Sequence, residues 1–118
     1  MANSTKVAQV SAVIATWCPH CHPQSVENSK LLSEKLGVPY RILNIDVEEE
    51  CQTADELVRK YGDDCSDYLI PQIFLEFADG KVQHIFTGFS ENPEVTRHHW
   101  RDLFESEFLS RLIQQNKS

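Results

Sequence analysis

Two strand-like segments joined by a helical pattern constrain the fold of this chain more than any other sequence feature. Residues 7–15 are rich in Val, Ile and Ala, and residues 39–47 alternate before they become apolar, so each segment predicts a β-strand. Residues 18–36 repeat apolar side chains at helical spacing and end before Gly37, a typical helix stop. Parallel strands need a crossover of this kind. The first third of the chain therefore predicts a parallel βαβ unit.

The third and fourth strand candidates lie close together in the sequence. Residues 73–77 and 82–87 both have strand character, and an Asp-Gly pair at positions 79–80 separates them. This pair between two apolar runs is a hairpin signal, because both residues tolerate the backbone angles of a tight turn. We therefore expect the two strands to pair antiparallel.

Two further helices are predicted. The shorter covers residues 54–61, with Thr53 or Asp55 as its N-terminal cap. The longer begins near Asn92, and the last residues of the chain, 114–118, should fray. Apolar side chains recur along one face of the longer helix and should pack in the core: Val95, Trp100, Leu103, Phe104, Phe108, Leu112 and Ile113.

Together these elements predict an α/β protein. The order βαβαββα predicts a central mixed sheet of about four strands with helices on both faces. A chain of 118 residues has the size of one domain and can bury a sizeable core without metals or disulfides. We expect a single domain over residues 1–118.

Acidic residues are concentrated in one part of the chain. The sequence has 18 acidic and 11 basic residues, a formal net charge of -7. Nine carboxylates lie between Asp46 and Asp67 against two basic residues, Arg59 and Lys60, which leaves minus seven in this segment. We expect a solvated acidic face that repels nucleic acid and acidic membranes. No apolar run approaches the ~18 residues of a transmembrane helix, so neither nucleic acid nor membrane is an expected partner.

The candidate reactive group is a pair of cysteines three residues apart, Cys18 and Cys21, where the first strand gives way to the helix. A cysteine at a helix N-terminus faces unpaired backbone N–H groups and the positive end of the dipole, which stabilise its thiolate. Pro19 suits the first helical turn, and a protonated His20 would add a cation beside Cys18. Cys21 lies one turn on and can attack a mixed disulfide formed on Cys18. This pattern indicates redox chemistry.

Two other interpretations of the cysteine pair are open. A structural zinc or iron–sulfur site could draw on the pair, on His22 and on the other two cysteines, although no second closely spaced pair exists. The run of residues 18–22 (CPHCH) also fits the attachment pattern of c-type haem, which requires export. We see no export signal and expect a reducing cytoplasm, where such a pair is more often catalytic or metal-binding than structural.

Several motifs resemble the thioredoxin and glutaredoxin superfamily, and the resemblance covers nearly the whole chain. Trp17 before Cys18, and residues 44–46 (NID), are similar to thioredoxin. The Cys-Pro-His-Cys motif differs by one residue from that of glutaredoxins, and a proline two residues after it is similar to small archaeal glutaredoxin-like proteins, the nearest relatives we expect. Residues 70–74 (IPQIF) resemble the segment whose proline is cis and packs against the cysteine pair.

The resemblance implies a thioredoxin-like fold, with the acidic residues 47–69 as an insertion about ten residues longer than usual. It makes Cys18 and Cys21 the catalytic pair, with Pro19 and His20 adjusting the thiolate. A cis Pro71 would turn the backbone of Ile70 toward a substrate strand. The residues it assigns to substrate binding are Trp17, Ile70, Pro71, Gly88 and Phe89.

The chain departs from this pattern at the positions that help to deprotonate the second cysteine. Thioredoxins carry a buried Asp where this chain has Ala12, and its lysine partner is replaced by Ile42. His20, His22 or bound water could take that proton, and the sequence does not choose among them. Where glutaredoxins carry a Gly-Gly turn that holds glutathione, only Gly88 is present.

The remaining cysteines, Cys51 and Cys65, flank the short helix predicted over residues 54–61. They could be free thiols, a local disulfide or an accessory redox pair, and free thiols are the default in a reducing cell. If bridged, they would close a loop of about fifteen residues and stabilise it by ~3 kcal/mol on the chain-entropy model.

These features predict a cytoplasmic, monomeric thiol:disulfide oxidoreductase that acts on protein disulfides. It would need no cofactor or metal beyond its own redox-active disulfide, and an external reductant such as a thioredoxin reductase or a low-molecular-weight thiol would restore the dithiol. A glutathione-linked glutaredoxin is an alternative within the same chemistry. A metal-binding or scaffold protein without turnover is an alternative from another class.

Overall fold

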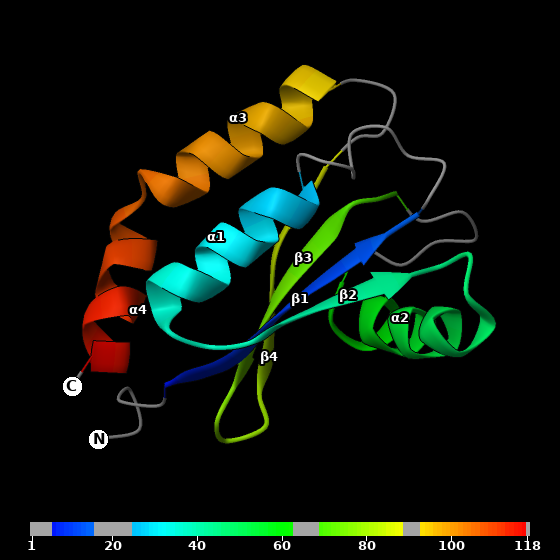
Figure 1. Cartoon of the computed structure of the whole chain (residues 1–118), viewed down its shortest axis with the longest axis horizontal. Helices are drawn as coiled ribbons and strands as arrows, with labels where there is room; N and C mark the ends of the chain where they lie inside the picture. Colours follow the sequence, from blue (N-terminus) through cyan, green and yellow to red (C-terminus); the bar gives the residue numbers. More distant parts are fainter. Residues whose placement is uncertain (1–5, 16–24, 63–68, 89–92, 118) are drawn as a thin grey trace.

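The computed structural model describes residues 6–15, 25–62, 69–88 and 93–117, which form a four-stranded mixed β-sheet flanked by helices (Figure 1). The strand order in the sheet is β2-β1-β3-β4, so the α/β class and the mixed sheet of about four strands are confirmed. The elements in chain order are β1 (Val7–Ile14), α1 (Val26–Leu36), β2 (Tyr40–Asn44), α2 (Glu48–Tyr61), β3 (Gln72–Phe77), β4 (Val82–Thr87), α3 (Pro93–Phe104) and α4 (Glu107–Lys117).

The strand pairings follow the predicted directions. β1 and β2 are parallel, whereas β3 is antiparallel both to β1 and to β4. The β3–β4 turn closes with a hydrogen bond of 2.8 Å from the Phe77 amide to the Lys81 carbonyl oxygen. Gly80 takes a φ of 92° in this turn, an angle that residues with side chains rarely adopt. The predicted βαβ unit and hairpin are therefore confirmed.

Helices cover both faces of the sheet, as the element order predicts. On one face Phe86 of β4 meets Trp100 of α3 edge to face, with ring centroids 5.0 Å apart. Successive residues of a strand point to opposite faces, and Phe74 of β3 lies on the other face, beside the end of α2. A Cβ added to Gly62 there would lie 2.8 Å from the Phe74 ring. The core therefore has two layers, one under α1 and α3 and one under α2.

The beginning of α2 differs from the prediction. The helix starts at Glu48, and Val47 is its N-cap, so neither Thr53 nor Asp55 caps it. Three glutamates fill its first turn, where negative charge is favourable at the positive end of the helix dipole. Glu50 accepts a hydrogen bond of 2.9 Å from the Asn44 amide at the end of β2. This contact ties the helix to the strand, which ends at Asn44 and is shorter than the predicted 39–47.

The predicted long C-terminal helix is divided into α3 and α4, between which the chain turns (Figure 1). The Ser106 hydroxyl lies at the break and caps α4, because it accepts a hydrogen bond of 3.1 Å from the Leu109 backbone amide. Because α4 is a separate helix, its inward-facing positions do not continue the helical spacing of α3. Leu109 therefore turns inward and is buried, whereas Phe108, expected in the core, is 37% exposed.

The C-terminal tail is also more ordered than predicted. Instead of fraying from residue 114, α4 continues to Lys117. The Asn116 side chain accepts a hydrogen bond from the Val7 amide at 3.0 Å, and donates to the carbonyl oxygens of Val7 at 3.1 Å and Leu36 at 3.0 Å. One side chain thus joins the end of α4 to the beginning of β1 and the end of α1.

Candidate functional site

Part of the predicted site lies outside the described residues. The predicted site residues in this part are the cysteine pair and its neighbours, the residue after Gly88, and one remaining cysteine: Trp17, Cys18, Pro19, His20, Cys21, Phe89 and Cys65. The described part of the predicted site consists of Ile70, Pro71, Gly88 and Cys51, together with the residues on either side of the cysteine segment.

The register of the sheet brings three of the chain's connections to one end. Val13 of β1 lies opposite Gln72 of β3, and Gln72 lies opposite Thr87 of β4, so these residues form a row across the sheet. Beyond this row, β1 continues toward the cysteine segment. At the same end of the sheet, Pro71 precedes Gln72 and Gly88 follows Thr87. Residues far apart in the sequence therefore converge at the end of β1.

Both flanks of the cysteine segment are fixed in the core. Ala15, which follows β1, is buried, and so is Ser25, which precedes α1. The Ser25 hydroxyl accepts a hydrogen bond of 3.2 Å from the Trp100 indole N–H of α3. A buried polar group needs such a partner, because an unpaired one costs free energy. The apolar spacing of the C-terminal segment predicts Trp100 in the core, but it gives no signal of this hydrogen bond to Ser25.

The Ile70–Pro71 peptide bond is cis, as the superfamily resemblance implies. Both residues are buried, and the Pro71 carbonyl oxygen accepts a hydrogen bond of 2.7 Å from the Gly88 amide. This bond extends the β3–β4 pairing by one step beyond the row. Pairing of Ile70 with a substrate strand stays a prediction.

Gly88 is packed too closely for any larger residue. A Cβ added there would lie 2.6 Å from the Thr96 hydroxyl oxygen and 2.9 Å from Pro71 Cδ. Thr96 is fully buried in α3 and was not among the predicted site residues. A threonine between Val95 and Arg97 gives no sequence signal of this contact, because only the packing of α3 on the sheet creates it.

The two departures from the thioredoxin pattern are neighbours in the sheet. Ala12 of β1 lies opposite Ile42 of β2. Ala12 is fully buried, and Ile42 is partly buried against the core. An apolar pair therefore occupies these two positions, with no group that could take a proton. The candidate acceptors His20 and His22 lie outside the described residues.

The sequence predicts Cys51 beside a short helix, but in the structure Cys51 lies within the first half of α2. It is a free thiol, and its sulfur lies 3.7 Å from a carboxylate oxygen of Asp55. Burial raises the pKa of this thiol above its ordinary value, and the charge of Asp55 raises it further. Cys51 is thus a weak nucleophile near neutral pH. The default prediction of a free thiol therefore holds for Cys51, whereas Cys65 lies outside the described residues.

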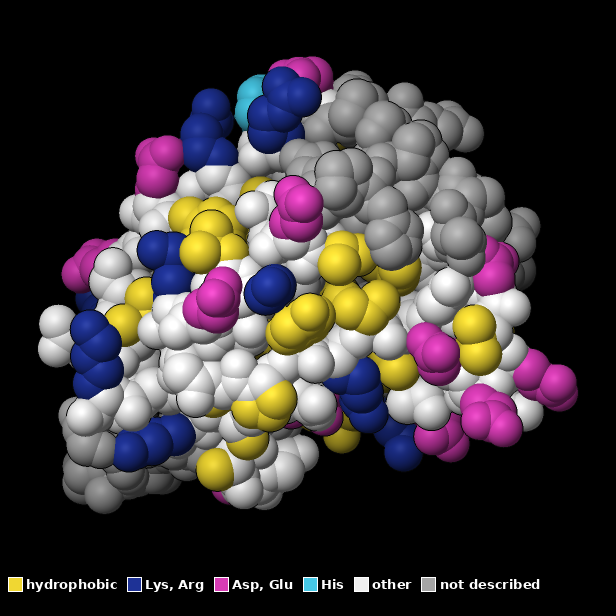
Figure 2. All heavy atoms as spheres, viewed as in Figure 1, with side chains coloured by type: hydrophobic (Ala, Val, Ile, Leu, Met, Phe, Trp, Pro, Cys, Tyr) yellow, Lys and Arg dark blue, Asp and Glu magenta, His cyan; other side chains and the backbone are white. Residues whose placement is uncertain are grey.

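The acidic side chains of α2 form a patch on the surface. Figure 2 shows acidic side chains gathered at the lower right, over α2. Glu48 and Glu49 are exposed there, together with Asp55 and Glu56. Within the described ranges, no three His, Cys, Asp or Glu side chains come together as a metal site requires. No helix of the described residues combines the length and apolar character that crossing a lipid bilayer requires.

Comparison with known proteins does not assign the chain to a family. No family model matches the sequence, and no curated protein or solved structure matches it significantly.

Proposed function

We propose that the protein is a thiol:disulfide oxidoreductase of thioredoxin-like fold that uses Cys18 and Cys21. The observation that carries the proposal is the convergence of Pro71 and Gly88 at the end of β1, from which the cysteine segment continues. The sheet order β2-β1-β3-β4, in which β3 runs opposite to the other three strands, agrees with the fold that the sequence motifs imply.

The reaction needs only the sulfur atoms of protein and substrate. The Cys18 thiolate attacks one sulfur of a substrate disulfide, a new S–S bond forms, and the other substrate sulfur leaves as a thiolate that takes a proton. Cys21 then attacks Cys18 in the mixed disulfide. The second substrate thiol leaves, and the Cys18–Cys21 disulfide retains the two oxidising equivalents. An external dithiol, or a reductase, returns the pair to the reduced state.

A protein disulfide is the proposed substrate, because the superfamily resemblance assigns Ile70, Pro71 and Gly88 to substrate binding. In this proposal the backbone of Ile70 pairs with a strand of the substrate. The apolar pair of Ala12 and Ile42 provides no buried base for the resolving step. The proton of Cys21 would then pass to His20, His22 or water.

The test is reduction of a protein disulfide, such as that of insulin, with an excess of a small dithiol as electron source. We expect Cys18→Ser to abolish turnover, and Cys21→Ser to accumulate a mixed disulfide that mass spectrometry detects. Cys51→Ser is the matched control, because the raised pKa of Cys51 makes it a weak nucleophile. Activity of the Cys51 variant should stay within about twofold of the wild type, a change of less than 0.5 kcal/mol in the barrier.

A second measurement tests the thiolate directly. Absorbance of the thiolate in Cys21→Ser should titrate with a pKa between ~3.5 and 7.5, the range of cysteines at helix N-termini. A midpoint near 8.5, about that of an unperturbed cysteine, would remove the basis for activation of Cys18. Unchanged exchange in Cys18→Ser, or bound metal without any exchange, would contradict the proposed function. Activity restricted to a mixed disulfide of glutathione would identify a glutaredoxin instead.

A further inference from the structure

Thr96 of α3 lies against the residues at which the pairing of β3 with β4 ends. Its side chain is fully buried, and its hydroxyl oxygen would lie 2.6 Å from a Cβ added to Gly88. The Pro71 ring closes the same space from another side, with its Cδ atom 2.9 Å from that position. Both distances are shorter than the contacts that Cβ atoms make in proteins. Gly88 is therefore held between Thr96 and Pro71 with no spare room.

Gly88 is in turn bonded to Pro71. Its amide donates a hydrogen bond of 2.7 Å to the Pro71 carbonyl oxygen, and both residues are buried. A shift of Gly88 would break this bond or move Pro71 with it, and a buried hydrogen bond is costly to leave unmade. Ile70 directly precedes Pro71 and is also buried. The position of the Ile70 backbone is therefore tied to Thr96 through Gly88 and Pro71.

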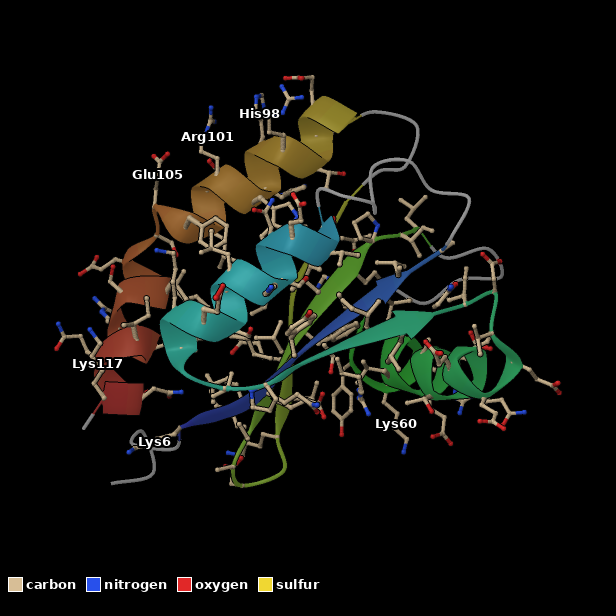
Figure 3. The ribbon with its side chains drawn as sticks, in the orientation of Figure 1. Lys6, Lys60, His98, Arg101, Glu105 and Lys117 are labelled. Atoms are coloured by element: carbon tan, nitrogen blue, oxygen red, sulfur yellow. The ribbon has the colours of Figure 1, made fainter. Side chains whose placement is uncertain are left out.

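The face of α3 that carries Thr96 is anchored one helical turn further on. Trp100 lies four residues after Thr96, so the two buried side chains share the inward face of the helix. The Trp100 ring packs edge to face on Phe86 of β4, and its indole N–H donates to the Ser25 hydroxyl. Three side chains point away from the sheet on the outer face of α3 (Figure 3): His98, Arg101 and Glu105. The helix is thus a fixed support behind Gly88.

We propose that Thr96 is a positioning residue for the candidate site. It holds Gly88 against Pro71 and so sets the place of the Ile70 backbone, to which the proposed function assigns pairing with a substrate strand. Thr96 is fully buried, so it acts through these residues rather than by contact with the substrate. This inference rests on the proposed function.

This role predicts a difference between two kinds of substrate. A protein disulfide lies in a chain whose backbone can pair with Ile70, whereas a small disulfide has no peptide backbone. A misplaced Ile70 therefore weakens binding of the protein substrate and leaves the exchange of sulfur bonds unaffected. With either substrate, the Cys18–Cys21 dithiol becomes a disulfide, and the substrate disulfide takes up its two electrons and two protons to become two thiols.

The test mixes the pre-reduced full chain with insulin or with hydroxyethyl disulfide, in the absence of any other reductant. Acid quenching, alkylation and mass spectrometry count the thiols that remain on the protein at each time. We expect Thr96→Ala to raise the half-saturating concentration of insulin about five- to tenfold, the equivalent of roughly one lost hydrogen bond. The maximal rate with insulin, and the rate with hydroxyethyl disulfide, should stay within about twofold of the wild type.

Two further variants and one matched control separate positioning from general stability. Thr96→Ser keeps the hydroxyl beside Gly88 and should restore the half-saturating concentration to within about twofold of the wild type. Thr96→Val places a larger methyl group there and should raise it, which gives a second test where the alanine variant does not fold. Ser33→Ala is the control. The Ser33 hydroxyl is also buried and donates to the Lys30 carbonyl oxygen at 2.6 Å, but it lies about 10 Å along α1 from its start at Val26, toward the beginning of β2.

Hydrogen exchange gives a readout that does not depend on activity. The Gly88 amide should exchange about fivefold faster or more in Thr96→Ala than in Ser33→Ala, because its bond to Pro71 opens more often. An unchanged exchange rate at Gly88, an equal loss with both substrates, or the same split from Ser33→Ala would overturn the positioning role but not the proposed function. If neither disulfide oxidises the wild-type dithiol, the proposed function is wrong, and this inference is overturned with it.

Discussion

Replacing Gly88 by alanine tests the packing that joins α3 to the candidate site. The added Cβ would lie 2.6 Å from the Thr96 hydroxyl oxygen and 2.9 Å from Pro71 Cδ. Atoms in contact normally lie about 3.5–4.0 Å apart, so the methyl group would overlap both neighbours by roughly 0.6 Å or more. Thr96 is buried and Pro71 is a rigid ring, so neither can move aside without disturbing the core.

We expect Gly88→Ala to lower the free energy of unfolding by about 1–3 kcal/mol, the usual cost of overpacking. Urea denaturation followed by circular dichroism measures this change. With a slope of about 2 kcal/mol per molar urea, the midpoint should fall by about 0.5–1.5 M.

A double-mutant cycle with Thr96→Ala identifies the cause. Thr96→Ala removes the oxygen nearest to the new methyl group but leaves Pro71 in place, so it should relieve only part of the overlap. We expect Gly88→Ala to cost at least about 0.5 kcal/mol less in the Thr96→Ala background. Equal costs in the two backgrounds, or a wild-type midpoint for Gly88→Ala alone, would refute the packing argument.

Two further predictions concern α4 and α2. Asn116→Ala removes three hydrogen bonds, which join it to Val7 and Leu36, so we expect the free energy of unfolding in urea to fall by about 1.5–4 kcal/mol. The control Lys117→Ala should change this free energy by less than about 0.5 kcal/mol. Asp55→Asn should lower the pKa of Cys51, because the Asp55 carboxylate raises it in the wild type. The measurement is the rate of Cys51 alkylation against pH in a chain whose other cysteines are replaced by serine. In this background, Asp55→Asn should shift the rise in rate to lower pH. An unchanged rate profile would contradict the assigned cause.

The sheet was predictable because its signals are local. Apolar runs and the Asp79-Gly80 pair predict β1, β3 and β4 closely, and their order predicts helices on both faces. The helix boundaries were harder. α2 starts at Glu48, with three glutamates in its first turn, before the Thr53 or Asp55 cap that the sequence predicts. The break capped by Ser106 divides a helix that the apolar spacing of the sequence predicts to be continuous.

The candidate site could be predicted by its residues but not by its supporting contacts. The resemblance of residues 70–74 to the superfamily segment implied the cis bond at Pro71, which the structure has. The contact of Thr96 with Gly88 and the hydrogen bond from Trp100 to Ser25 join segments far apart in the chain. Only the final packing of α3 determines such pairs, so no short pattern reports them.

The hydrogen bonds between Asn116 and Val7 have a practical consequence for handling the protein. They hold the two ends of the described chain together at the beginning of β1, which is about 23 Å long. A carrier domain or surface tether fused at either end would thus be kept well away from Pro71 and Gly88. A short glycine linker could join the ends and allow a circular permutant opened at the Gly80 turn.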